Sequence, residues 1–261
     1  MSVIRSRENK RVKSWIRLAQ APRERRQRGL ALIEGFHLVE TFLRGDRVPT
    51  GLIVSESALD RTEIAQLMET SGIAPFVLSD TLFNQICDAG MQVGIAAEIQ
   101  IPHQEIDPAG STGCLFLEGI QDAGNVGTIL RTATAFGVRD VLLGSGCADP
   151  WSPKALRAGM GGHFYLRIAA SADLCQDVIR FGVRSICTAP RGGEPLGSID
   201  LTGRIGWIFG NEGAGVSAAV AGHATHIATI ATPGNAESLN VAASVAICLY
   251  EQERQLSKRD A

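Results

Sequence analysis

Short apolar runs alternate with longer amphipathic stretches through the second half of the chain. The apolar runs have the length of buried strands, and the stretches between them repeat apolar residues at the three- and four-residue spacing of helices. This alternation is typical of a mostly parallel sheet covered by helices. We predict strands over 114–119, 141–143, 185–189, 204–209 and 226–231, and helices over 126–136, 153–160, 172–181, 216–223 and 239–256.

The first half has a less regular pattern, which predicts a smaller α/β unit. We predict, in order, a helix over 9–19, a charged turn over 23–29, a helix in the second half of 31–44, a strand over 51–56, a helix over 62–70, a strand over 75–78, a helical turn over 82–87 and a strand over 94–101. The next stretch carries two prolines and a glycine without periodicity, as a linker does. The expected domains are residues 1–102 and 113–261, joined by residues 103–112.

Two predicted strands end in glycine-bearing loops. Run 204–209 breaks into residues 210–215, and run 226–231 breaks into residues 232–235. A parallel α/β sheet binds its ligand at such loops. The first loop is neither a GxGxxG fingerprint nor a P-loop, because its glycines are spaced differently and no Gly-Lys-Ser/Thr follows. The helix after the second loop is apolar on nearly every side through Tyr250, so we expect it to be buried in a core or against a partner.

Net charge is only −2, but the charge is unevenly distributed. Residues 1–30 hold ten Lys or Arg against two Glu, whereas the remaining residues hold 15 basic and 25 acidic side chains. A concentrated basic segment attracts polyanions, and phosphate contacts dominate the affinity for nucleic acids. We therefore expect a basic N-terminal arm that contacts RNA; the alternative is a solvated arm without a partner.

The composition also excludes several classes of protein. No run is long and apolar enough for a transmembrane helix, and the charged N-terminus does not resemble a signal peptide. The six cysteines form no CxxC pair and lie mostly in apolar runs, which favours reduced thiols and a cytoplasmic location. His223 and His226 lack the nearby cysteines or carboxylates of a metal site, so we expect no metal.

Three segments carry candidate chemistry. Asn125 is a candidate N-cap of the helix over 126–136 and is expected at the carboxyl edge of the sheet, and Arg131 lies off the apolar stripe of this helix. The alternatives are that Asn125 is only a helix cap and that Arg131 is only a surface charge. Glu212 is either a carboxylate facing the site or a helix-start residue. Ser238 is a candidate N-cap, and Asn240 is an amide that needs partners if it is buried.

In this order and spacing, the three segments resemble the signature motifs of the SpoU (TrmH) family of RNA ribose 2′-O-methyltransferases, in the SPOUT superfamily. The motifs are NxGxxxR from Asn125 to Arg131, FGNEGxG from Phe209 to Gly215, and ESLNVAxS from Glu237 to Ser244. The resemblance as a whole covers residues 113–261. The first half is similar, more loosely, to the L30e-like substrate-binding domain of rRNA-modifying members.

The resemblance implies an α/β fold: a C-terminal trefoil-knot (SPOUT) domain with a mostly parallel sheet, and a smaller N-terminal L30e-like α/β domain. It also implies a homodimer whose active site is shared between subunits. S-adenosylmethionine is expected in the knot, bound mainly through backbone groups. The cofactor-binding residues implied are Phe209, Gly210, Asn211, Gly213, Ile230, Gly234, Ser238 and Leu239. The family's usual Ile-Pro-Met is here Ile230-Ala231-Thr232, which puts cofactor affinity in question.

Family precedent brings Arg131 to the ribose 2′-hydroxyl. A guanidinium is always protonated, so we expect Arg131 to bind the adjacent phosphate and to orient the hydroxyl. The catalytic residues implied are Asn125, Arg131, Glu212, Ser238 and Asn240. The residues expected to bind RNA are Arg5, Arg7, Lys10, Arg11, Lys13, Lys154 and Arg157.

The function implied is transfer of a methyl group from S-adenosylmethionine to a ribose 2′-hydroxyl in structured RNA. The N-terminal domain favours large-subunit rRNA, because short tRNA enzymes of this family lack such a domain. Two alternatives remain open: a tRNA 2′-O-methyltransferase, and an RNA-binding or ribosome-assembly protein without turnover. A nucleotide-dependent α/β enzyme is disfavoured because no known phosphate-binding loop is present.

Overall fold

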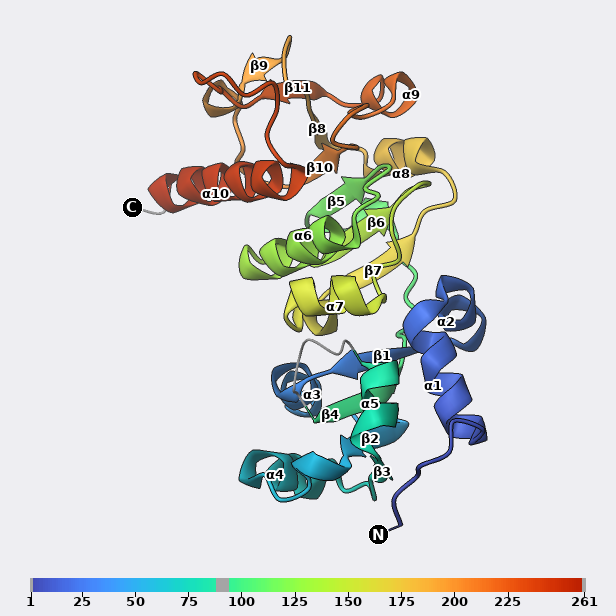
Figure 1. Cartoon of the computed structure of the whole chain (residues 1–261). Helices are drawn as coiled ribbons and strands as arrows, with labels where there is room; N and C mark the ends of the chain where they lie inside the picture. The colour runs from blue at the N-terminus through green and yellow to red at the C-terminus, as the bar shows by residue number, and fades with distance from the viewer. Residues whose placement is uncertain (1, 88–93, 260–261) are drawn as a thin grey trace. The chain divides into compact units, whose positions relative to one another are not determined.

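A computed structural model describes residues 2–87 and 94–259 (Figure 1). The chain divides into two compact units. The first comprises residues 1–103 with 149–161, and the second comprises residues 104–148 with 162–261. Among the described residues, no helix is both long and apolar enough to span a bilayer.

A four-stranded sheet forms the centre of the first unit. Its strands are β1 (Leu30–Glu34), β2 (Gly51–Ser55), β3 (Phe76–Leu78) and β4 (Ile95–Gln100). In the order β1-β4-β2-β3, the first two pairings are antiparallel and the last is parallel. The helices of this unit are α1 (Lys10–Gln20), α2 (Pro22–Arg28), α3 (Phe36–Leu43), α4 (Thr62–Ser71), α5 (Asp80–Ile86) and α7 (Pro153–Gly159). The segment over 31–44 thus begins with a strand and is helical only in its second half, as predicted.

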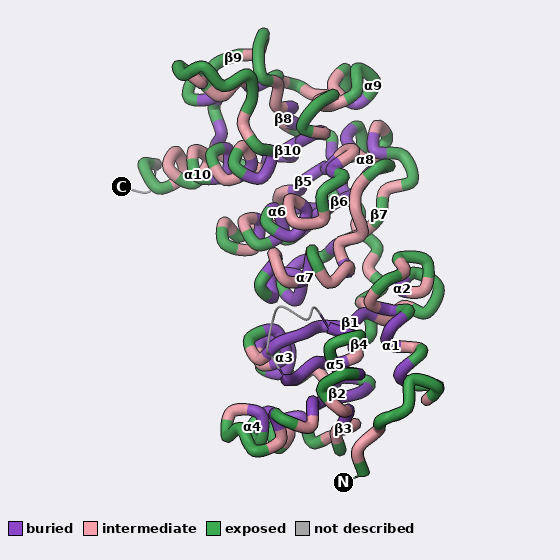
Figure 2. Tube along the Cα trace, in the orientation of Figure 1, coloured by how far each residue is buried: buried purple, intermediate pink, exposed green. Residues whose placement is uncertain are grey.

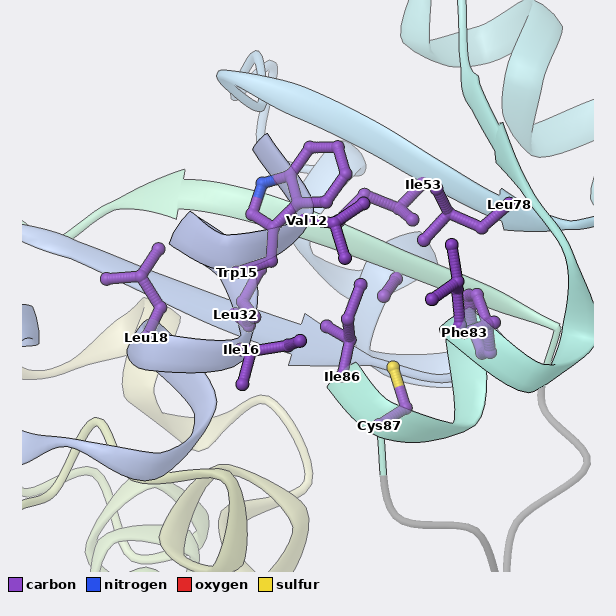
Figure 3. Packing of buried hydrophobic residues seen from close by; sticks show 12 residues of the cluster. Val12, Trp15, Ile16, Leu18, Leu32, Ile53, Leu78, Phe83, Ile86 and Cys87 are labelled. Atoms are coloured by element: carbon purple, nitrogen blue, oxygen red, sulfur yellow. The ribbon is translucent and has the colours of Figure 1, made fainter. Parts of the chain in front are cut away.

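The basic N-terminal segment is packed into this unit. Helix α1 forms because its apolar residues repeat on one face and the side chain of Asn9 accepts a hydrogen bond from the backbone of Arg11 at 2.9 Å. That face packs into a core shared with β2, β3 and α5; Figure 3 shows Val12, Trp15, Ile53 and Phe83 among its members. The basic segment over residues 1–30 is therefore not a solvated arm, because apolar burial holds α1 in place, and its contact with RNA stays a prediction.

The charged turn predicted over 23–29 is also wrong. Residues 22–28 form α2, which begins with proline and ends at Gly29 in the left-handed conformation (φ 62°). Its single fully buried side chain is Arg25, which donates to Asp149 at 2.7 Å and to the carbonyl of Ala19 at 3.2 Å. A buried charge requires such partners, so α2 is held by an ion pair and not by an apolar stripe.

A seven-stranded sheet forms the centre of the second unit. Its strands are β5 (Cys114–Leu117), β6 (Asp140–Leu143), β7 (Arg167–Ala170), β8 (Arg184–Thr188), β9 (Glu194–Pro195), β10 (Ile205–Phe209) and β11 (His226–Thr229). The order is β7-β6-β5-β10-β8-β11-β9, and every pairing between these strands is parallel. The prediction of two sheets, a large and mostly parallel one in the second unit and a smaller one in the first, is confirmed. Figure 2 shows that the central strands are buried. The knot stays a prediction.

The helices of the second unit are α6 (Ala123–Ala135), α8 (Leu174–Phe181), α9 (Ala218–Ala221) and α10 (Val241–Arg259). Helices α6 and α10 pack against each other. The N-cap of α6 is Asp122, whose side chain accepts from the backbone of Asn125 at 3.0 Å. Asn125 therefore lies inside the first turn, and its prediction as the N-cap is wrong. This position frees its side chain for other partners. Gly137 has a φ of 73° just after the helix, a conformation that glycine adopts readily at this position.

The stretch predicted as a linker over 103–112 is mostly packed onto the second unit. Pro108–Gly110 form a short 3-10 helix. The guanidinium of Arg204 donates to the carbonyls of Ser111 and Pro108 at 2.5 and 2.6 Å and lies 4.3 Å from the ring centroid of Phe181. Whether residues 1–102 and 113–261 are separate folding domains stays a prediction.

Candidate active site

A pocket of about 180 Å³ lies where β8, β10 and β11 end. It is lined by Thr188, Ala189, Pro190, Gly210, Asn211, Glu212, Gly213, Ala214, Gly215, Ile230, Thr232, Glu237, Ser238, Leu239, Val241 and Ser244. Parallel strands bring their carboxyl ends to one edge of the sheet, which is where α/β proteins bind ligands. The two glycine-bearing loops and the start of α10 therefore meet at one site, as the sequence predicted.

The loop after β10 has a shape that only glycine allows at its first position. A Cβ atom on Gly210 would lie 2.2 Å from the backbone carbon of Gly215. The side chain of Asn211 holds the loop: its amide donates to the carbonyl of Gly119 at 3.0 Å, and its oxygen accepts from the backbone of Gly213 at 2.8 Å and of Ala214 at 3.0 Å. Asn211 is thus occupied in shaping the pocket wall.

Glu118, which the sequence did not single out, fixes the far end of the same loop. Its carboxylate accepts from the backbone N–H and the hydroxyl of Ser217 at 2.7 and 2.8 Å. Its own backbone N–H donates to the carbonyl of Phe209 at 2.9 Å. An acidic residue directly after a buried strand was the signal available, because charged residues at that edge of a parallel sheet face the ligand-binding loops.

Three side chains from the three motifs form one hydrogen-bonded chain. The amide of Asn125 donates to the carboxylate of Glu212, and its oxygen accepts from the amide of Asn240 at 3.0 Å. These residues are 87 and 115 positions apart in sequence. An ionised carboxylate can only accept, so it directs the NH2 group of Asn125 toward itself and the oxygen toward Asn240. The chain therefore joins the loop after β10, helix α6 and the start of α10.

Asn240 also begins α10. Its side-chain oxygen accepts from the backbone of Ala242 at 2.9 Å and of Ala243 at 3.3 Å, so it is the N-cap of this helix. The sequence predicted hydrogen-bond partners for Asn240 on the assumption that its amide is buried, but the residue is exposed. Ser238, the cap that the sequence suggested, lines the pocket two residues earlier with Leu239. Helix α10 buries Val241, Ala242, Val245, Cys248 and Leu249 and leaves Ile247 and Tyr250 exposed.

Five predicted catalytic or cofactor-binding residues do not line this pocket. Asn125 and Asn240 are linked to it through the carboxylate of Glu212, whereas Phe209, Gly234 and Arg131 are not. Phe209 is fully buried and stacks on Trp207 with ring centroids 6.0 Å apart. Gly234 does not line the pocket, and a Cβ atom there would meet nothing within 4 Å. Arg131 follows Asn125 by six residues on α6, which turns it about 240° around the helix. Its side chain is exposed, and no hydrogen bond or ion pair holds it among the described residues.

The predicted RNA-binding residues all belong to the first unit, where several have partners. Arg5 pairs with Glu56 at 2.5 Å, and Arg11 lies 4.4 Å from the ring centroid of Phe76. Two more ion pairs are Lys13 with Glu8 and Arg157 with the buried carboxylate of Glu34. Lys154 is exposed. Arg7 and Lys10 are exposed and carry no side-chain bond within the described part of the chain.

Cysteine chemistry does not contribute to this site. Burial raises the pKa of the Cys248 thiol to about 12 and that of Cys187 to about 11, so both stay protonated at neutral pH. All six cysteines are free. Over residues 2–87 and 94–259, no three side chains of the metal-binding types come together.

Comparisons with known proteins agree with this geometry. Residues 113–250 match the model of the SpoU rRNA Methylase family, and residues 9–97 match that of the MRM3-like substrate binding domain. The chain is 34% identical to the 23S rRNA (guanosine(2553)-2'-O)-methyltransferase RlmP of Bacillus subtilis, over 96% of this chain and 98% of that protein. It is 29% identical to the 23S rRNA (guanosine-2'-O-)-methyltransferase RlmB of Coxiella burnetii, over 85% and 95% of the two chains.

Solved structures give the same result. A crystal structure of an RNA 2'-O ribose methyltransferase superposes with a TM-score of 0.83 at 27% identity, covering 98% of this chain and all of that one. An AdoMet-bound rRNA methyltransferase from Sinorhizobium meliloti superposes with a TM-score of 0.83 at 26% identity, covering 98% of each chain.

Proposed function

This chain belongs to the SpoU rRNA methylase family, and we propose that it transfers a methyl group from S-adenosylmethionine to a ribose 2′-hydroxyl of large-subunit rRNA. The observation that carries this proposal is the hydrogen-bonded chain from Glu212 through Asn125 to Asn240, which brings the three motifs together beside one pocket. Relatives named as 23S rRNA 2'-O-methyltransferases align over nearly the whole chain, which supports the choice of reaction and substrate.

The pocket suits S-adenosylmethionine. Residues of the two glycine-bearing loops line it. The backbone groups that such loops expose recognise adenine well. Glu212 and Glu237 are its charged lining residues, and neither Lys nor Arg lines it. This charge favours a cationic sulfonium and disfavours a polyphosphate, which argues against a nucleotide-dependent enzyme. When bound, the cofactor supplies an electrophilic methyl group.

Protein side chains would then orient the ribose. Asn125 is bonded to both Glu212 and Asn240, so its amide is held in one orientation next to Glu212, which lines the pocket. Ser238 adds a hydroxyl to the lining. Arg131 would bind the phosphate next to the reacting ribose and orient its hydroxyl, since a guanidinium cannot accept a proton at neutral pH. Orientation of this kind is a main source of rate enhancement when a cofactor carries the reactive group.

A second copy of the chain would complete the site. Arg131 does not line the pocket of its own chain, and it lies on α6, the helix that packs against α10. Ile247 and Tyr250 are exposed on α10, 38% and 61% respectively. Burial of these apolar side chains against a second copy would place two α6 helices near one interface. This arrangement supports a homodimer in which each pocket receives Arg131 from the partner.

We call the second unit, residues 104–148 with 162–261, the methylase unit. The substrate-binding domain over residues 9–97 favours rRNA over tRNA, because it adds a second RNA-binding surface to the methylase unit. Exposed Arg7 and Lys10 belong to the same unit. Six free cysteines also fit a reducing compartment, and we place the enzyme with its rRNA in the cytoplasm. The intact hydrogen-bonded chain argues against a binding protein without turnover.

Radiolabelled methyl transfer to separated rRNA and tRNA from cells that lack the protein tests this proposal. A 2′-O-methyl group blocks alkaline cleavage at its own phosphodiester, so label should appear in alkali-resistant dinucleotides from rRNA. Label in the tRNA fraction would indicate the tRNA alternative, and label in mononucleotides would place the methyl group on the base. Intact cofactor binding with no label in naked RNA or in isolated precursor ribosomal particles would refute turnover.

A further inference from the structure

A second pocket lies in the methylase unit, at the opposite edge of the sheet. Its volume is about 600 Å³, and it lies where β6 and β7 begin. It is lined by Gln104, Gly110, Thr112, Arg139, Asp140, Phe164, Tyr165, Leu166 and Arg167. Strand β6 has four residues, so the two edges are about 13 Å apart along the strands. A nucleotide in this pocket is therefore a different one from the nucleotide that is methylated.

The charge of this pocket is positive. The carboxylate of Asp140 is buried and saturated: it accepts from Nε and the terminal nitrogen of Arg167, each at 2.6 Å, and from the hydroxyl of Ser111. Asp140 and Arg167 thus neutralise each other. Arg139 adds a further positive charge; its side chain is exposed and has no hydrogen bond or ion pair with any described residue. The guanidinium of Arg139 is therefore available to bind an anion.

The same pocket is lined by an exposed aromatic ring. Tyr165 is 58% exposed, although an aromatic side chain usually contributes to a core or an interface. Gln104 accepts from the backbone of Ile168 at 3.0 Å through its side-chain oxygen, which fixes the amide and leaves its NH2 group as a donor. A ring, a fixed amide donor and an available guanidinium are the groups that proteins use to stack a base, read its edge and bind its phosphate.

We propose that this pocket binds one unpaired nucleotide of the RNA substrate, away from the methylated ribose, with its base stacked on Tyr165 and a neighbouring phosphate on Arg139. This assignment rests on the proposed function, which supplies the RNA. It gives the methylase unit its own contact with the substrate, in addition to the substrate-binding unit. The contact selects RNA that is single-stranded at this position, because a paired base has no free face for the ring.

Fluorescence anisotropy with the full-length protein tests the assignment. The probes are a twelve-nucleotide oligoadenosine and the same backbone without bases. Tyr165→Ala should weaken binding of the oligoadenosine at least about fivefold and leave the abasic probe unchanged, because only the stacked base is lost. Tyr165→Phe should bind within about twofold of the wild type. Arg139→Ala should weaken both probes and lower the slope of log K against log salt by about one.

Arg44→Ala is the matched control, because it removes one exposed charge from the other unit. It should not reproduce the loss caused by Arg139→Ala. Unchanged oligoadenosine binding in Tyr165→Ala, or equal losses in Arg139→Ala and Arg44→Ala, would overturn the assignment. Binding of S-adenosylhomocysteine should be the same in all variants. Failure of the wild type to bind S-adenosylhomocysteine would instead refute the proposed function, and the two failures are therefore distinguishable.

Discussion

The side-chain amide of Asn240 donates to the side-chain oxygen of Asn125 at 3.0 Å and joins the start of α10 to α6. The same residue caps α10 through its oxygen, so one side chain has a structural and a positioning role. Asn240→Asp keeps the capping oxygen but places a second acceptor against Asn125. If Asn125 turned its amide round, its oxygen would face the carboxylate of Glu212 instead.

We therefore expect Asn240→Asp to retain most of the stability of the wild type and to lose methyl transfer about tenfold or more. Asn240→Ala should lose the cap as well, which costs about 0.5–2 kcal/mol of unfolding free energy. Chemical denaturation and single-turnover methyl transfer measure the two effects separately. Equal activity in Asn240→Asp and the wild type would show that the bond to Asn125 does not position the site.

Substitution by alanine should affect stability differently at two glycines, Gly210 and Gly234, of the two glycine-bearing loops. Gly210→Ala would push a methyl group to 2.2 Å from the backbone of Gly215, so the loop must move. We expect a loss of at least about 1–3 kcal/mol in stability and loss of S-adenosylmethionine binding. At Gly234 a Cβ atom has open space, so Gly234→Ala should leave stability unchanged.

Calorimetric titration of Gly234→Ala with S-adenosylhomocysteine then tests the cofactor contact predicted there. Weaker binding in a protein of unchanged stability would place the cofactor against this backbone. Gly197→Ala is a suitable control, since a Cβ atom there also meets nothing within 4 Å and Gly197 does not line the pocket. Wild-type affinity in Gly234→Ala would remove Gly234 from the cofactor site.

Much of this architecture could be predicted from the sequence, because the buried strands are continuous apolar runs. Strand β7 was missed because it has only four residues, of which Ile168 alone is buried, so it is too short and too exposed to give the pattern of a buried strand. Helix α2 was missed for a similar reason, since Arg25 is its one buried side chain. Apolar periodicity carries no signal where an ion pair holds an element.

The candidate site could also be predicted only in part from the sequence. The motifs indicated which residues matter, but the bonds of Asn125 join residues 87 and 115 positions apart, and only the tertiary fold brings these together. Glu118 was missed because it lies outside the quoted motifs, although it anchors Ser217. The role of Asn125 changed because Asp122, three residues earlier, is the better-placed cap.

Basic residues of the first unit should fall into two groups. Arg7 and Lys10 are exposed, so Arg7→Ala and Lys10→Ala should each lower the salt slope of RNA binding by about one without loss of stability. Arg25→Ala should destabilise the unit strongly, because it leaves Asp149 buried without its partner. Deletion of residues 1–30 is a poor test of RNA binding, since it also removes Val12 and Trp15 from the core. Filter binding at several salt concentrations, with thermal melts, separates the groups.

The stability contributed by Glu251 should depend on pH. Hydrogen bonds from Arg254 and Gln255 lower the pKa of this carboxyl from 4.5 to about 2. A folded-state pKa below the unfolded value stabilises the protein above pH 4.5, and this stabilisation is lost as the pH falls from 4.5 toward 2. Urea unfolding should therefore show a gap between the wild type and Glu251→Gln at pH 7 that narrows at pH 3.5. Glu253→Gln, a substitution at an exposed position, is the control, and a constant gap would contradict the prediction.

In the homodimer that we propose, Arg131 of one copy and Glu212 of the other should act in the same active site. Arg131 is exposed on α6, on a different side of the helix from Asn125, which bonds to Glu212. We expect Arg131→Ala and Glu212→Gln to be nearly inactive alone. A mixture that forms heterodimers holds one site with both residues intact, so its methyl transfer should recover to about a quarter of the wild-type rate if subunits mix at random and sites act independently. No recovery in heterodimers verified by mass spectrometry would place Arg131 in the site of its own chain, since both defects would then remain in separate sites.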